Sequence, residues 1–182
     1  FFLGPAAAED TDEGEDEVYF KPHVKKMRDA IDNVRRMREA VGEDVDLNLE
    51  LHRRLTPAEA VVFARGVEQY HPMFIEDPIR PEGPDAMARV AEKIHIPIAT
   101  GERFANLYEF QALMVRGGVD YARADLCHCG GITAGVKIAA IAEAIGVRGQ
   151  TVEDPATLAQ AVRDAIALNE PIVLDVHIDG AV

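Results

Sequence analysis

Short apolar runs that end in an acid, with helical patterns between them, constrain this chain most. The runs at 45–49, 73–75 and 96–99 lead to Glu50, Glu76 and Glu102, which are spaced 26 residues apart. Strands that alternate with helices at this interval indicate a parallel sheet covered by helices. The same spacing predicts that the three acids follow successive strands of that sheet.

The expected elements follow from apolar periodicity and from helix-capping residues. Thr56, Pro57 and Glu59 form a capping box, which predicts a helix that begins there. Gly42 stops an earlier helical pattern. The expected helices are 24–41, 56–69, 85–94, 107–116 and 132–145, with a later one opening at 154–155. The expected strands are 45–50, 73–76, 96–100, 119–125, "GQTVED" at 149–154 and 171–178.

Two closures of such a sheet fit the pattern: a (β/α)8 TIM barrel, partial or rebuilt, and a doubly wound open sheet. About seven strands are visible if the apolar stretch 1–5 counts as one, so a barrel of eight lacks its first strand. We expect residues 1–144 to be the barrel portion and residues 145–182 to be a βαβ-type tail that completes the same domain. No GxGxxG or Walker pattern supports a nucleotide site.

Charge excludes one class of function. The 182 residues carry a net charge of −13, which argues against a nucleic-acid partner. Part of the excess is local, because seven acids lie between Glu9 and Glu17 in a stretch expected to be a solvated loop. No secretory segment or long apolar run is visible, so we expect a cytoplasmic protein with no membrane partner.

The three acids carry the strongest chemical signal. Carboxyl ends of parallel strands share one rim of a barrel, and active sites are built there. Glu50, Glu76 and Glu102 would repel one another at that rim, and a divalent cation relieves the repulsion. Because the ligands are all oxygens, the pattern predicts Mg²⁺. The alternative is three unrelated acids that cap helices or form ion pairs.

Three further residues are candidates for the site. His52 follows Glu50 by two residues, and a strand continuing that far would place its side chain near the ligand for proton transfer. Asp125 could orient a base or bind substrate, or simply cap a helix. Arg103 could pair with an anionic substrate, whereas Arg53 and Arg54 are expected on the surface. The cysteines at 127 and 129 are too close together for an ordinary disulfide, and "CHC" lacks the spacing of a zinc site.

Four ordered motifs, "LELHRRLTPAEA", "FIEDPIRPE", "PIATGERF" and "ADLCHCGGIT", resemble the barrel domain of the enolase superfamily. The resemblance covers about residues 1–144 and is strongest to mandelate racemase-like acid-sugar dehydratases. It implies that Glu50, Glu76 and Glu102 bind Mg²⁺, that His52 helps the β-hydroxyl leave, and that Asp125 belongs to an Asp–His dyad. It also implies a small sugar-acid substrate that yields a 2-keto-3-deoxy acid, and a homo-oligomer.

The chain also departs from that family. Many relatives have Asp where Glu50 stands. The dyad histidine is missing from "GVRGQTVEDPATLAQ", and neither the lysine-bearing strand nor the capping domain is visible. Residues 145–182 instead resemble the end of the pyrophosphate domain of thiamine-diphosphate enzymes, which indicates a composite chain. The alternative is a divergent relative whose tail matches by chance. We therefore expect a dehydratase site with weak or no turnover. The alternative is a non-catalytic chimeric or engineered α/β scaffold.

Overall fold

A computed structural model describes residues 22–80, 83–146, 148–152, 155–157, 159–160, 163–164 and 172–176. The acidic stretch 9–17 and the expected strand at 1–5 lie outside these residues. The described helices are α2 (His23–Val41), α3 (Pro57–Val67), α4 (Pro84–Ala91), α5 (Leu107–Val115), α6 (Leu126–Cys129) and α7 (Gly131–Ala144), with 3₁₀ turns η1 (Glu68–Tyr70) and η2 (Pro155–Thr157). The described strands are β1 (Asn48–Glu50), β2 (Phe74–Glu76), β3 (Ile98–Thr100), β4 (Tyr121–Ala122), β5 (Arg148–Val152) and β6 (Ile172–Val176).

Local capping explains where two of the central helices begin. Thr56 accepts a hydrogen bond from the backbone N–H of Glu59, whose carboxylate accepts one from the backbone N–H of Thr56. Asn106 and Glu109 form the same reciprocal box at the start of α5. The capping box expected at 56–59 is therefore confirmed. Each box pairs backbone donors that the first helical turn leaves without partners.

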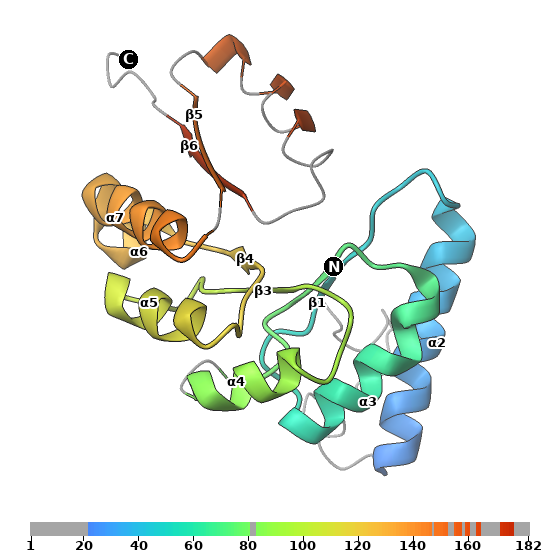
Figure 1. Ribbon diagram of the computed structural model, residues 1–182. Coiled ribbons are helices and arrows are strands. Elements are labelled where there is room, and N and C mark those ends of the chain that lie inside the picture. Colours follow the sequence, from blue (N-terminus) through green and yellow to red (C-terminus); the bar gives the residue numbers. More distant parts are fainter. Residues whose placement is uncertain are drawn as a thin grey trace.

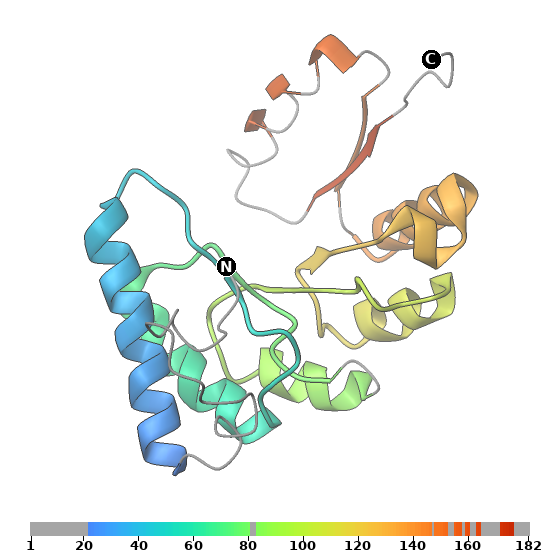
Figure 2. The same ribbon diagram turned by 180° about the vertical axis from the view of Figure 1, so that it is seen from behind.

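The first four strands form one parallel sheet in the order β1-β2-β3-β4. A doubly wound sheet reverses its strand order part-way, whereas a barrel adds strands consecutively. Helices α2, α3, α4, α5 and α7 pack each on the next and follow an arc outside the strands, as the two opposite views show (Figure 1, Figure 2). The described sheet therefore follows the barrel alternative.

The core lies between this arc and the sheet. Leu49, Ile75 and Ile98 from successive strands are almost fully buried, and Phe63 and Phe110 meet them from the helices. β2 and β3 are buried at every residue, as expected for parallel strands covered by helices. The buried strands fix the register of β1, β2 and β3, and thereby the relative positions of the acids at their carboxyl ends.

Some expected elements differ in the structure. The strand expected at 119–125 is reduced to β4, because Asp125 instead caps the short helix α6. The helix expected to open at 154–155 begins as the 3₁₀ turn η2 within the described residues. β5 and β6 pair in parallel as a separate two-stranded sheet that contacts α7. Whether 145–182 completes the same domain stays a prediction.

Within the described parts of the chain, every helix is too short or too polar to span a membrane.

Candidate active site

The three acids lie at the carboxyl ends of three neighbouring strands of the sheet. Glu50 and Glu76 are the last residues of β1 and β2 and are direct partners in the register of these strands. Glu102 lies two residues beyond the end of β3. Gly101 precedes it with a φ of 127°, and a Cβ built there would lie 2.5 Å from the Phe110 ring. Glycine is thus needed where the chain turns out of β3 toward Glu102.

Electrostatics shows that these carboxylates act on one another. Burial, together with the negative charges of Glu76, Asp77 and Glu102, raises the pKa of Glu50 to about 7, although the backbone N–H of His52 opposes this shift. Burial, with the charges of Asp77 and Glu102, also raises the pKa of Glu76, against the opposing charge of Arg123. The acids therefore share one crowded negative field, which a cation would relieve.

Two arginines lie among these acids. The Arg53 Nη1 atom lies 2.5 Å from the Asp77 Oδ2 atom and also donates to Glu102. The Arg123 Nε atom lies 3.2 Å from the Glu76 Oε1 atom. Arg53 was expected on the surface, and that expectation is wrong, because its side chain is only 15% exposed. The carboxylates of Asp77 and Glu102 draw it inward.

Sequence reasoning also missed Asp77. This residue is 2% exposed, and its Oδ1 atom accepts a hydrogen bond of 2.6 Å from the Thr100 hydroxyl. Its backbone N–H donates to the Ala99 carbonyl, so the strand pairing of β2 and β3 continues past Glu76. The consecutive acids at the end of β2 were the available signal, but only the sheet shows which of them is fully buried.

His52 lies beside Glu50, but a turn rather than the expected continuation of the strand brings it there. The strand ends at Glu50, and His52 occupies a turn with a left-handed φ of 51°. Its backbone N–H donates to the Glu50 Oε1 atom at 2.5 Å, and its Nδ1 atom lies 3.9 Å from the same oxygen. Its Nε2 atom lies 3.0 Å from the Arg53 Nη2 atom. Because an arginine nitrogen can only donate, this contact makes Nε2 the acceptor.

The other two candidates, Asp125 and Arg103, are also exposed. The Asp125 carboxylate accepts a hydrogen bond of 2.8 Å from the Cys127 backbone N–H and thereby caps α6. Arg103 follows Glu102 and lines a cavity beside the acids. The proximity of His52 to Glu50 is thus established, whereas the chemical roles of His52, Asp125 and Arg103 stay predictions.

The donor set fits a hard cation. In this arrangement no three His, Cys, Asp or Glu side chains of the described residues converge closely enough to hold an ion, since Arg53 and Arg123 lie among the carboxylates. The candidate ligands are nonetheless all carboxylate oxygens, which suit Mg²⁺. Burial and the charges of neighbouring acids raise the pKa values of Glu50 and Glu76, and a bound cation would instead favour their ionised forms.

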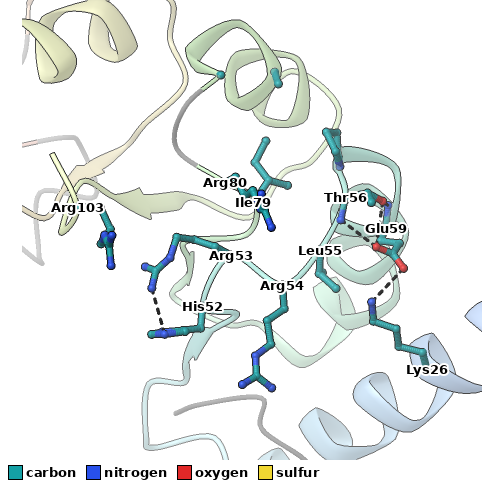
Figure 3. A pocket seen from close by; sticks show the side chains of 13 residues that line it. Lys26, His52, Arg53, Arg54, Leu55, Thr56, Glu59, Ile79, Arg80 and Arg103 are labelled. Atoms are coloured by element: carbon teal, nitrogen blue, oxygen red, sulfur yellow. Dashed lines mark hydrogen bonds and ion pairs between the residues drawn. The ribbon is translucent and has the colours of Figure 1, made fainter. Parts of the chain in front are cut away.

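A cavity of about 1010 Å³ opens next to these residues. It is lined by side chains from α2, from the turn after β1, and from the segments that follow β2 and β3. Figure 3 shows Arg53 and Arg103 on one side of it and the Lys26–Glu59 pair on another. Its lining includes His52, Arg53 and Arg103, so the cavity adjoins the acid cluster.

The chain is similar to proteins of a known family. A family model described as enolase C-terminal domain-like matches residues 5–179. D-galactonate dehydratases are similar: that of Cronobacter sakazakii is 39% identical over 123 residues, and that of Ralstonia pickettii 42% identical over 118. These alignments cover 68% and 65% of this chain but 32% and 31% of the relatives, so the chain spans about a third of their length.

Solved structures agree with the fold. A mandelate racemase/muconate lactonizing enzyme-like protein from Rubrobacter xylanophilus superposes with a TM-score of 0.65 at 29% identity, covering 84% of this chain and 39% of that one. An enolase from Agrobacterium radiobacter, with bound sodium and L-malate, superposes with a TM-score of 0.67 at 28% identity, covering 87% and 41%.

Proposed function

Starting from the fact that the chain belongs to the enolase C-terminal domain-like family, we propose that it carries the cation-binding part of a sugar-acid dehydratase. The reaction would remove water from a sugar acid of the gluconate, galactonate or xylonate type and give a 2-keto-3-deoxy acid. D-galactonate dehydratases among the similar proteins support this reaction class.

One observation carries the proposal. Glu50, Glu76 and Glu102 lie at the carboxyl ends of three consecutive parallel strands. Burial, with repulsion from the neighbouring acids added to it, raises the pKa values of Glu50 and Glu76. These residues would hold Mg²⁺. When bound, the ion would supply positive charge for the substrate carboxylate and make the adjacent C–H more acidic.

Side chains of this protein would protonate the leaving group and bind the substrate. The His52 imidazole would give a proton to the departing β-hydroxyl, which leaves as water. Because Arg53 donates to the Nε2 atom, the proton of the neutral ring resides on Nδ1, on the side of Glu50. Arg103 would pair with the anionic substrate.

Removal of the α-proton is the weak point. Asp125 is engaged in capping α6, and no histidine stands where the family's dyad partner is expected. Loss of one partner of a catalytic pair costs orders of magnitude in rate. We therefore propose weak or no turnover for this chain, with a non-catalytic scaffold as the second candidate. The composite origin of the tail also stays a proposal, and the family match that extends to residue 179 weighs against it.

Magnesium titration followed by calorimetry and thermal unfolding tests the proposal. We expect Mg²⁺ to bind and to raise the unfolding temperature, and we expect the Glu76→Gln/Glu102→Gln variant to lose both effects. The matched control, Glu92→Gln/Glu143→Gln, removes the same charge from two exposed positions and should bind as the original chain does. No response of the original chain to Mg²⁺ would favour the scaffold. Incubation with several sugar acids then measures residual dehydration.

A further inference from the structure

The Arg53 guanidinium contacts three partners that come from different parts of the acid cluster. Its Nη1 atom lies 2.5 Å from the Asp77 Oδ2 atom and also donates to Glu102. Its Nη2 atom lies 3.0 Å from the His52 Nε2 atom, and Figure 3 shows the side chain turned toward that imidazole. One largely buried cation thus lies between the carboxyl ends of β2 and β3.

The two acids that share this cation are held very differently. Asp77 is buried, and the Thr100 hydroxyl donates to its Oδ1 atom, while its Oδ2 atom pairs with Arg53. The Glu102 side chain is 39% exposed, and Arg53 is its ion-pair partner among the described residues. Loss of the contact with Asp77 would be costly, because it leaves a buried charge uncompensated. Glu102, in contrast, can exchange Arg53 for another cation.

A backbone hydrogen bond fixes the position from which the Arg53 side chain extends. The Arg53 N–H donates to the Asp77 carbonyl at 2.7 Å, so the turn after β1 is attached to the end of β2. The side chain can therefore release Glu102 while the turn that carries it stays in place. Arg123, the other arginine of the cluster, has no such anchor: its side chain is 52% exposed, and its one acid partner among the described residues is Glu76.

We propose that Arg53 is a built-in counter-cation of the acid cluster: it pairs with Glu102 until a divalent cation binds, and then releases Glu102 to the ion while it keeps Asp77. This inference rests on the proposed function, in which Glu102 is a ligand of that ion. Two negative charges are left over when every group of the cluster is ionised, and a divalent cation brings the same number of positive charges. The groups of the cluster are the carboxylates of Glu50, Glu76, Asp77 and Glu102 and the guanidinium groups of Arg53 and Arg123.

Such an exchange means that Arg53 lowers the apparent affinity for the ion. Binding depends on the fraction of molecules in which Glu102 is free, and the contact with Arg53 reduces that fraction. In return, the same contact spares the ion-free protein two unpaired neighbouring carboxylates. A purely structural arginine would have the opposite effect, because its loss would disorder the ligands and weaken ion binding. Repulsion between like charges alone would act similarly through Arg53 and Arg123.

Replacement of the tethered guanidinium by free guanidinium tests the inference. In Arg53→Ala, we expect the unfolding temperature without Mg²⁺ to fall by several degrees, and the affinity for Mg²⁺, measured by isothermal titration calorimetry, to rise severalfold. Guanidinium chloride at about 10 mM, far below the molar concentrations that unfold proteins, should partly reverse both changes by occupying the vacated place. Choline chloride at the same concentration controls for ionic strength.

Two matched variants separate the exchange from a general effect of charge. Arg123→Ala removes a guanidinium beside Glu76, and Arg89→Ala removes one from an exposed position of α4. Neither change vacates a place beside a buried acid, so free guanidinium should act on these variants no more than choline does. If Arg53→Ala does not fold, Arg53→Ala/Asp77→Asn removes the uncompensated charge and should bind Mg²⁺ more tightly than Asp77→Asn does.

Unchanged or weaker Mg²⁺ binding in Arg53→Ala would overturn the inference. So would a guanidinium effect that is absent from Arg53→Ala or equally large in Arg123→Ala. If neither the original chain nor Arg53→Ala binds Mg²⁺, the cation site is rejected and the inference with it. Loss of water from sugar acids is assayed separately. Exchange at Arg53 in a chain that binds Mg²⁺ but removes no water would leave the inference standing and would favour the non-catalytic scaffold over the dehydratase.

Discussion

Arg53 and Asp77 form an ion pair of 2.5 Å that joins the turn after β1 to the carboxyl end of β2. The Arg53 backbone N–H also donates to the Asp77 carbonyl at 2.7 Å. Both residues have a positive φ, 63° for Arg53 and 44° for Asp77, which non-glycine residues rarely adopt. The double contact holds this strained backbone in place, and strain of this kind concentrates at functional sites.

Arg53→Gln should destabilise the protein without Mg²⁺ by about 2–4 kcal/mol, because Asp77 would be left buried without its counter-charge. The same substitution should strengthen Mg²⁺ binding severalfold, since it frees the Glu102 carboxylate and removes a nearby positive charge. Thermal unfolding with and without Mg²⁺ measures both effects, and Arg89→Gln serves as the control. Unchanged or weaker Mg²⁺ binding in Arg53→Gln would show that Arg53 does not compete with the ion.

Glu50 predicts a pH dependence of stability. Its folded-state pKa of about 7 lies above the ordinary value of 4.5, so the folded protein binds more protons than the unfolded chain between these values. The contribution of this group to stability is therefore fully present below about pH 4.5 and is lost as pH rises toward 7. This rise in pKa corresponds to about 3 kcal/mol, and solvent screening of the half-buried carboxylate reduces it to on the order of 2 kcal/mol. Urea unfolding across this range, without Mg²⁺, measures it.

Glu50→Gln removes this titrating group and should flatten its part of the pH profile. Saturating Mg²⁺ should do the same in the original chain, because a bound cation favours the ionised carboxylate. Mg²⁺ affinity itself should fall as pH drops below about 7. A pH profile that is identical in Glu50→Gln and the original chain would assign the dependence to other groups.

Gly101→Ala should be strongly destabilising, by more than about 2 kcal/mol, because the new Cβ would meet the Phe110 ring and the backbone has a φ of 127°. Gly117→Ala is the matched control: its φ is also positive, at 67°, but a Cβ there has open space. Chemical denaturation of both variants separates the clash from the backbone strain. Equal losses of stability would mean that the Phe110 contact contributes nothing.

Thr56→Ala should cost about 1 kcal/mol, because the first turn of α3 loses the side-chain acceptor for the Glu59 backbone N–H. Thr56→Ser keeps the hydroxyl and should cost only a few tenths of that amount. Thermal unfolding compares the two. A loss of the same size in both variants would assign the effect to the threonine methyl group rather than to the cap.

Sequence patterns among neighbouring residues correctly predicted many of the helices and strands. The apolar periodicity of α2, the capping box of α3 and the apolar runs of β2 and β3 are features of neighbouring residues, so they can be read without coordinates. β4 was overestimated because the capping tendency of Asp125 competes with the strand pattern before it. The division at 144 and the origin of the tail are not tested by the fold.

The even spacing of Glu50, Glu76 and Glu102 was sufficient to place them at the carboxyl ends of three consecutive strands, because one βα unit returns the chain to the same edge of a parallel sheet. Which charges surround them depends on the tertiary structure. Asp77 is buried, and Arg53 turns inward to it, only because β1, β2 and β3 lie side by side in register. Burial and through-space charge depend on residues distant in the chain, so no local pattern contains them.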